Sequence, residues 1–289
     1  MLVTLKSILN MAEEKEYAIG AFNVPNLESL LAVVQAAEDL KLPVIIQHAQ
    51  AHEDLIPLSV IGPIMLKTAE QASVPVCVHL DHASSLEVIS QSLSLGFTSV
   101  MYDGSALPYE ENLRNTLIAV EMASETGASV EAELGVIGKK ETGLEDIPED
   151  GETAHIYTDP DQAKVFVRET GIDALACAFG TVHGIYFRKP KLRFEIVEGV
   201  RKAAGNIPVV MHGGSGLSRD EYRQAIRAGV RKINYFTYMN KTGGEACIDY
   251  INQSSDHSAP IFFTQLSIKA KNAMNEHIKQ IMKIFALLD

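Results

Sequence analysis

The sequence predicts an α/β fold, a single-domain (β/α)8 TIM barrel with extra terminal helices that spans residues 1–289. Three observations predict it. Short apolar runs alternate with helix-like segments, no Pro- or Ser-rich linker interrupts them, and polar residues follow many of the runs. A doubly wound open sheet is the alternative. Against it, no G-x-G-x-x-G motif follows the first run, and the polar residues are spread over many strand ends.

The apolar runs have the length and composition of buried strands. They are Tyr17–Asn23, Pro43–Gln47, Val74–Asp81, Thr98–Tyr102, Ser129–Glu133, Asp173–Ala178, Pro208–His212 and Val230–Asn234. Because strands that alternate with helices build a parallel sheet, eight such units predict a closed barrel.

Helices are expected before, between and after these runs. They cover residues 4–13, 26–40, a stretch within 53–72, 85–95, 109–125, a segment that begins at Thr158–Pro160, then 194–204, 218–228 and much of 242–286. The start at Thr158–Pro160 combines a capping side chain with Pro in the first turn. Residues 134–158 have no apolar period, and a connection of this length is usually functional.

Composition excludes several classes of function. The chain has 289 residues, of which 46% are hydrophobic and 21% charged, as in ordinary globular proteins. A net charge of −12 gives no electrostatic support for nucleic-acid binding. Its 3 cysteines lie far apart and predict no disulfide scaffold. We see no apolar run of membrane-spanning length and no signal peptide, and we therefore expect a cytoplasmic protein that binds no membrane.

Histidines follow three of the predicted strands. His82 and His212 end their strands, and His183 comes shortly after the strand at 173–178. Because catalytic groups of barrels gather where strands run into the following loops, these imidazoles are expected to converge. Three imidazoles with an open fourth position are typical of catalytic zinc, although cobalt, nickel or iron would suit the same ligands.

Carboxylates occupy the same kind of position. Asp81 directly precedes His82, and Asp103 and Glu133 end two further strands, where they would supply a second or alternative position for a divalent metal. Adjacent strand residues point to opposite faces, so Asp81 and His82 share a site only if the chain leaves the strand between them. Asp103 also fits a simple Asp-Gly-Ser turn.

The remaining histidines have a structural interpretation. His79 is expected inside its strand, and His48, His52 and His277 are expected at the surface or behind the site, as are His155 and His257.

A glycine-rich loop follows the seventh strand and reads His212-Gly213-Gly214-Ser215-Gly216. Its backbone N–H groups, together with those of the turn after the eighth strand, form the kind of pocket in which barrels often bind phosphate. Alone, a Gly-Gly-Ser-Gly stretch signals only a turn.

With these residues identified, the chain resembles the class II, zinc-dependent ketose-bisphosphate aldolases, which include fructose- and tagatose-bisphosphate aldolases. The resemblance covers roughly residues 2–286. The motifs that carry it are Ala21-Phe22-Asn23-Val24, His79-Leu80-Asp81-His82, Tyr102-Asp103-Gly104-Ser105, Val130-Glu131-Ala132-Glu133-Leu134-Gly135, Val182-His183-Gly184-Ile185-Tyr186 and His212-Gly213-Gly214-Ser215-Gly216.

The resemblance implies a role for each matching residue. His82, His183 and His212 bind zinc, with Asp103 and Glu133 near the alternative metal position. Asp81 is the acid/base at the C4 hydroxyl, and Glu141 exchanges the proton at C3. The residues implied to contact substrate, phosphate or a monovalent cation are Asn23, Gly184, Arg188, Gly213, Ser215, Asn234 and Thr237.

The implied activity is reversible cleavage of a phosphorylated ketose to dihydroxyacetone phosphate and an aldehyde such as glyceraldehyde 3-phosphate. This reaction belongs to carbohydrate metabolism, and one step of glycolysis is an example of it. The long segment 134–158, which carries Glu141, would close over the site. The implied assembly is a homodimer or homotetramer, with residues 242–286 available for an interface.

Three departures from the family pattern surround the expected substrate. The turn after Asn234 contains Tyr235 and Phe236, expected to reshape the phosphate or ketose end. Phe187-Arg188 replaces a usual Lys, and Gln47–His52 replaces a Ser-Glu-Gly-Ala-like stretch. Two alternatives follow: the same chemistry on another or monophosphorylated sugar, or a non-catalytic relative that senses a sugar phosphate.

Overall fold

The computed structural model describes residues 1–135, 157–186, 189–253 and 260–288. Its strands are β1 (Leu2–Val3), β2 (Ile19–Asn23), β3 (Val44–Ala49), β4 (Val76–Ala83), β5 (Ser99–Tyr102), β6 (Ser129–Leu134), β7 (Ala174–Cys177), β8 (Val209–Met211) and β9 (Val230–Tyr235). Its helices are α1 (Leu5–Lys15), α2 (Leu27–Leu40), α3 (Leu58–Gln71), α4 (Leu86–Leu95), α5 (Tyr109–Thr126), α6 (Pro160–Thr170), α7 (Phe194–Ala203), α8 (Arg219–Ala228), α9 (Thr237–Gln253) and α10 (Phe263–Phe285), with a short 3-10 helix at Gln50–His52.

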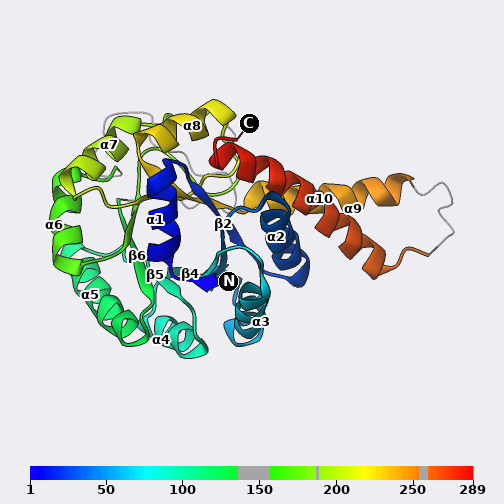
Figure 1. Ribbon diagram of the computed structural model, residues 1–289, viewed down its shortest axis with the longest axis horizontal. Coiled ribbons are helices and arrows are strands. Elements are labelled where there is room, and N and C mark those ends of the chain that lie inside the picture. Colours follow the sequence, from blue (N-terminus) through cyan, green and yellow to red (C-terminus); the bar gives the residue numbers. More distant parts are fainter. Residues whose placement is uncertain (136–156, 187–188, 254–259, 289) are drawn as a thin grey trace.

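Strands β2 to β9 form a closed parallel barrel. Each pairs with the next, and β9 returns to β2 through the registers Ile19↔Lys232 and Ala21↔Asn234. The helices surround this barrel, as Figure 1 shows. The predicted (β/α)8 barrel with an extra terminal helix is therefore confirmed. The sequence did not predict β1, which pairs with β4 beside the barrel.

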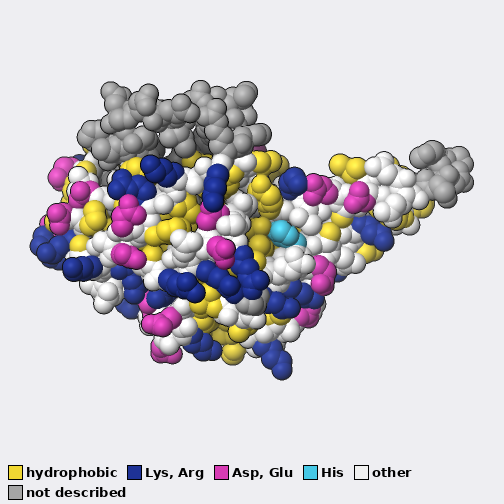
Figure 2. All heavy atoms as spheres, turned by 90° about the horizontal axis from the view of Figure 1, so that it is seen from above, with side chains coloured by type: hydrophobic (Ala, Val, Ile, Leu, Met, Phe, Trp, Pro, Cys, Tyr) yellow, Lys and Arg dark blue, Asp and Glu magenta, His cyan; other side chains and the backbone are white. Residues whose placement is uncertain are grey.

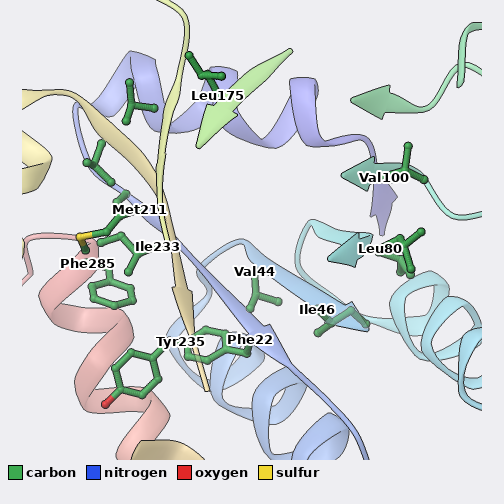
Figure 3. Close-up of a cluster of buried hydrophobic side chains, with 14 of the residues drawn as sticks. Phe22, Val44, Ile46, Leu80, Val100, Leu175, Met211, Ile233, Tyr235 and Phe285 are labelled. Carbon is green, nitrogen blue, oxygen red and sulfur yellow. The ribbon is translucent and has the colours of Figure 1, made fainter. Parts of the chain in front are cut away.

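Two hydrophobic clusters fill the structure. The larger one lies between the strands and the surrounding helices, and Figure 3 shows part of it, with Phe22, Tyr235 and Phe285 close together. The smaller one lies inside the barrel, where α1 packs Leu5, Ile8 and Leu9 against the first inward-facing residues of the strands. The helix α1 begins at its cap Thr4, whose hydroxyl accepts a hydrogen bond from the backbone N–H of Ser7.

Helices α9 and α10 extend away from the barrel as an arm, visible on the right of Figures 1 and 2. Its base is held at the barrel, since Asn275 of α10 donates a hydrogen bond to the carbonyl of Ala32 in α2. Farther out, large apolar side chains are exposed. They are Ile248, Ile251, Ile261, Phe262, Phe263 and Ile268.

Candidate active site

The three predicted histidines converge at the carboxyl end of the barrel. One nitrogen of each of His82, His183 and His212 lies within 4.8 Å of the others. The His212 Nδ1 and His82 Nε2 atoms are only 2.8 Å apart, and the rings of His82 and His183 have centroids separated by 5.1 Å. Three converging imidazole nitrogens, with His212 buried and His82 and His183 partly exposed, are a donor set that fits a divalent metal ion with an open position.

Asp81 and His82 reach this site together because the chain changes direction between them. Asp81 continues the inward-facing alternation of β4, whereas His82 has a positive φ of 49° and the β4–β5 register shifts between Leu80 and Ala83. A positive φ is uncommon for a residue with a Cβ and is maintained only by the surrounding structure. The predicted exit from the strand between Asp81 and His82 is therefore wrong, because β4 continues to Ala83 and an irregularity within the strand turns both side chains toward the site.

A second cluster shares His82 with the first. His82, Asp103 and Glu133 also place one donor atom each within 4.8 Å of the others. Asp103 Oδ2 lies 2.8 Å from His82 Nδ1, and the Ser105 hydroxyl donates to Asp103 Oδ1 at 2.6 Å. Glu133 Oε2 is buried and has no hydrogen-bond partner among the described residues, which fits a missing cation. The residues present therefore fit the predicted alternative metal position.

Charges in this cluster compete strongly for protons. Burial and the nearby Asp103 carboxylate raise the pKa of Glu133 to about 8. Burial opposes the charged form of His82, but Asp81, the Asp103 hydrogen bond and Glu133 outweigh it and raise the pKa of His82 to about 9. Metal binding by these residues would therefore compete with protons for His82 and Glu133.

Sequence reasoning missed Glu131, a carboxylate that orients His212. Glu131 Oε1 lies 2.7 Å from His212 Nε2, leaving the Nδ1 atom of His212 facing the other imidazoles. Such carboxylate–histidine pairs fix the ring orientation of metal ligands. Glu131 and Glu133 are two residues apart on β6, so both face the barrel interior, and this period was the signal that could have identified Glu131.

Lys232 was also missed, and it neutralises Glu131. Its Nζ atom lies 2.8 Å from Glu131 Oε2, and both side chains are fully buried. Burial alone would raise the pKa of Glu131, but Lys232 and His212 lower it to about 2. His79, predicted to be structural, is buried beside this pair with Nε2 3.6 Å from Glu131 Oε2.

Asp81 is held by two amides. Asn23 and Asn234 each donate a hydrogen bond of 3.0 Å to one of its carboxylate oxygens. Lys232 donates to the Asn234 amide oxygen, and Gln47 donates to that of Asn23. Burial raises the pKa of Asp81, but the positive charges around it, first that of His82, outweigh burial and keep its pKa far below the usual range. Asp81 is thus an ionised carboxylate in a fixed orientation.

Comparison with known proteins agrees with this geometry. A family model described as fructose-bisphosphate aldolase class-II matches residues 3–288. The chain belongs to the class II fructose-bisphosphate aldolase family. The YdjI protein of Escherichia coli (strain K12) is 38% identical over 285 residues, which cover 99% of this chain and 98% of YdjI.

Solved structures of aldolases share the fold. The structure of the YdjI aldolase from Escherichia coli K12 superposes with a TM-score of 0.85 at 37% identity, covering 99% of this chain and 97% of that one. A protein of Coccidioides immitis, provisionally assigned as a fructose-1,6-bisphosphate aldolase, gives 0.82 at 32% identity, with coverage of 97% and 95%. Fructose-bisphosphate aldolase of Campylobacter jejuni gives 0.82 at 21% identity, with coverage of 98% and 95%.

The glycine loops that the aldolase family resemblance linked to phosphate come together at the ends of β7, β8 and β9. Gly184 and Gly213 have positive φ values of 94° and 64°, and a Cβ on Gly213 would lie 2.5 Å from the Val182 carbonyl oxygen. The Tyr186 hydroxyl joins these loops by donating to the Gly213 carbonyl at 2.8 Å. Glycine is therefore required at 213 by both space and conformation.

The next part of this aldolase chain connects the glycine loop with α9. Ser215 Oγ accepts a hydrogen bond from the backbone N–H of Phe236 at 3.0 Å, and Thr237 is the first residue of α9. Asn234, expected to contact substrate or phosphate, has its amide engaged by Asp81 and Lys232. Two of the residues predicted from the sequence, Glu141 and Arg188, lie outside the described residues.

One expectation about the substrate end was wrong for Tyr235. Because Asn234 faces the barrel interior, its neighbour Tyr235 faces outward, where its hydroxyl lies 2.7 Å from His277 Nε2 and its ring packs near Phe285 (Figure 3). It cannot reshape the phosphate end directly. Phe236 does lie at the mouth, with its ring centroid 5.0 Å from that of His52.

The part of the chain that the structure describes contains no helix long and apolar enough to cross a membrane.

Proposed function

We propose that this protein is a metal-dependent aldolase that reversibly cleaves a phosphorylated ketose to dihydroxyacetone phosphate and an aldehyde. The proposal covers fructose- and tagatose-1,6-bisphosphate, whose aldehyde product is glyceraldehyde 3-phosphate, and ketoses with a single phosphate. The observation that carries it is the convergence of three imidazole donors beside Asp81, an ionised and fully hydrogen-bonded carboxylate. Membership of the class II aldolase family supports the same chemistry.

His82, His183 and His212 would hold the metal ion, for which we propose zinc, and Asp103 and Glu133 would complete the alternative position with His82. When bound, the ion would act as a Lewis acid that stabilises the negative charge developing on the three-carbon fragment. Glu131 holds the His212 ring in the orientation this ligation requires. Gly184, Gly213 and Ser215 would bind phosphate and a monovalent cation, with Thr237 at the α9 terminus.

Asp81 would remove the proton from the C4 hydroxyl as the C3–C4 bond breaks. The electron pair of that bond stays on C3, and the C4 hydroxyl becomes the aldehyde carbonyl. Glu141 would then return a proton to C3, giving dihydroxyacetone phosphate. A general base must already be ionised and in position: the amides of Asn23 and Asn234 hold Asp81 in place, and the positive charges around it keep its pKa low.

The test begins with dihydroxyacetone phosphate in heavy water, because this half-reaction involves no aldehyde. Metal-replete protein is expected to exchange one C3 hydrogen stereospecifically, and proton NMR follows the loss of its signal. A chelator should stop exchange and added zinc should restore it. Absence of exchange in protein shown to hold metal would contradict the proposed function.

Two variants separate the proton transfers. Asp81→Asn should abolish aldol cleavage while C3 exchange persists, because Asp81 acts at C4 only. Glu141→Gln should abolish exchange itself. A different result would favour the alternative of a non-catalytic sugar-phosphate sensor. In that case the wild-type protein would show no turnover, and Asp81→Asn would still bind dihydroxyacetone phosphate normally.

We also propose that the protein works as a homodimer or homotetramer through the arm formed by α9 and α10. Phe262 and Phe263 on this arm are 59% and 78% exposed, and Ile248 and Ile268 lie on the same two helices. Exposed apolar groups of this kind are typical of protein interfaces. Sedimentation should show an oligomer that Phe263→Asp weakens. We place the protein in the cytoplasm, since Cys77, Cys177 and Cys247 are all free thiols.

A further inference from the structure

The end of β3 and the segment that follows it contain an unusual group of unsatisfied polar atoms. In the described residues, 9 buried side-chain nitrogen and oxygen atoms lack a hydrogen-bond partner, and Gln47 Oε1, both ring nitrogens of His48 and Nδ1 of His52 are among them. Buried polar atoms without partners are costly, and such atoms in a functional region point to a ligand or an ordered water. The proposed function explains the unsatisfied Glu133 but not this group.

Hydrogen bonds to the Gln50 and Glu53 side chains hold this segment in place. The Gln50 side chain accepts a hydrogen bond from the backbone N–H of Ser84, and Glu53 accepts one from that of Leu58 at the start of α3. Glu53 Oε2 also lies 3.5 Å from His48 Nε2, too far for a strong hydrogen bond. The imidazoles are therefore positioned without being satisfied.

His52 lies at the mouth of the barrel. Its ring centroid is 5.0 Å from that of Phe236, which follows β9, and 6.4 Å from that of His48, which is completely buried. Gln47 hydrogen-bonds Asn23, which in turn holds Asp81, so this segment begins directly beside the carboxylate that would act on C4. The end of β3 lies directly beside Asp81, because Ala49 of β3 pairs with Asp81 of β4, so a ketose with its C4 hydroxyl at Asp81 has room to extend along this segment.

The charge of this region does not suit a second phosphate. No Lys or Arg occurs from Leu42 to Leu66, and Glu53 and Asp54 add negative charge. Burial lowers the pKa of His52, so its ring is neutral at physiological pH and offers one donor and one acceptor. Hydroxyl groups match that pair of functions, whereas a phosphate dianion needs cations or several N–H donors.

We propose that His52, supported by His48 and Glu53, binds hydroxyl groups of the aldehyde half of the substrate, and that this half carries no phosphate. The proposal rests on the proposed function, because it extends the ketose from Asp81. It makes the substrate a ketose monophosphate, with its phosphate on the dihydroxyacetone half.

The first test compares aldehydes in the condensation direction. At saturating dihydroxyacetone phosphate, unphosphorylated glyceraldehyde, erythrose and longer aldoses are compared with glyceraldehyde 3-phosphate. We expect the best unphosphorylated aldose to exceed glyceraldehyde 3-phosphate at least tenfold in kcat/KM. A tenfold preference for glyceraldehyde 3-phosphate would overturn the proposal.

The second test assigns this preference to His52. His52→Ala should raise KM for the preferred aldose about tenfold. The same substitution should change the rate of C3 exchange about tenfold less than it changes KM. His52→Gln retains a donor and an acceptor and should recover part of the loss. His277→Ala is the matched control, since His277 is another half-buried imidazole but contacts Tyr235 outside the barrel.

The outcomes distinguish the two proposals. No exchange in metal-replete wild-type protein refutes the aldolase assignment and this inference with it. Normal exchange, with His52→Ala lowering exchange and condensation equally, would assign His52 a structural role only and refute this inference alone.

Discussion

At its amino end the barrel interior is a hydrophobic core, whereas at its carboxyl end the same eight strands surround charged and polar side chains. The first region packs residues such as Ile19, Ile45 and Val210 against α1. The second contains Glu131, His212 and the other polar groups of the site, nearly all buried. Inward-facing side chains of a barrel lie in layers, and here the layers change from apolar to ionic along the strands.

The two regions have different physical requirements. The apolar layer needs only to fill its volume. A truncation there lowers the free energy of unfolding through the lost burial and the cavity left behind. The polar layer needs a partner for every charge, because an unpaired buried charge is far more costly than a cavity. We therefore expect substitutions near α1 to change stability alone, and substitutions near the metal donors to change chemistry, stability or both.

The largest effect on chemistry is expected for His183→Ala. His183 lies in a loop after β7, and its ring contacts His82 and His212 rather than a structural element. Its loss should remove one metal donor and slow C3 exchange by roughly a thousandfold, equal to about 4 kcal/mol. Urea denaturation of the metal-free variant should match that of the metal-free wild type. A variant that kept its metal and its rate would disprove ligation by His183.

Lys232→Met should give the largest loss of stability, since Lys232 lies where the two layers meet and is the cation paired with buried Glu131. Removing one partner of a buried ion pair typically costs about 3–5 kcal/mol. The measurement is urea denaturation of the metal-free protein. In the double variant Lys232→Met/Glu131→Gln no carboxylate is stranded, so at least half of the lost stability should return. Full additivity of the two substitutions would show that the pair is not coupled.

Much of this arrangement could be predicted from the sequence. Each strand of the barrel itself was found because the apolar runs are separated by helical segments, and His82, His212, Asp103 and Glu133 were found because they end such runs. The alternation of side chains along a strand and the residue at which a strand ends can both be read from local sequence. In a barrel, residues at the carboxyl ends of all strands gather around one site.

The residues that were missed depend on contacts between strands. Lys232 within Val230–Tyr235 resembles an ordinary solvent-exposed lysine until closure of the barrel brings it to Glu131 of β6, a strand with which β9 does not pair. The outward direction of Tyr235 follows from the register of β9 with β2, which the sequence does not state. The unsatisfied atoms of His48, at the end of β3, and of His52, in the 3-10 turn that follows, arise from three-dimensional packing, for which the sequence carries no strong signal.

A smaller effect, confined to stability, is expected in the apolar layer. Leu9 of α1 is fully buried and belongs to the apolar cluster at the amino end of the barrel. Leu9→Ala should lower the free energy of unfolding by about 2–4 kcal/mol through lost burial and a new cavity. Zinc affinity and C3 exchange per folded molecule should be the same as in the wild type. A tenfold change in either would mean that the two layers are not independent.

The smallest effect concerns the pH dependence of the metal-free protein. The pKa of His82 rises from its ordinary value to about 9, so the stability it contributes is complete below pH 6.5 and is lost as pH rises toward 9. Glu133, whose pKa is raised to about 8, changes stability in the same direction, because the folded protein holds its proton longer than the unfolded chain does. Both groups therefore destabilise the metal-free fold as pH increases.

Between pH 6.5 and 8.5 the metal-free protein should therefore lose stability, seen as a Tm that falls as the pH rises. The difference in Tm between zinc-loaded and metal-free protein should increase as the pH rises, because zinc competes with the protons on these groups. Calorimetry at several pH values measures both. His82→Gln should flatten the metal-free profile, and an unchanged slope in that variant would assign the pH dependence to other titratable groups.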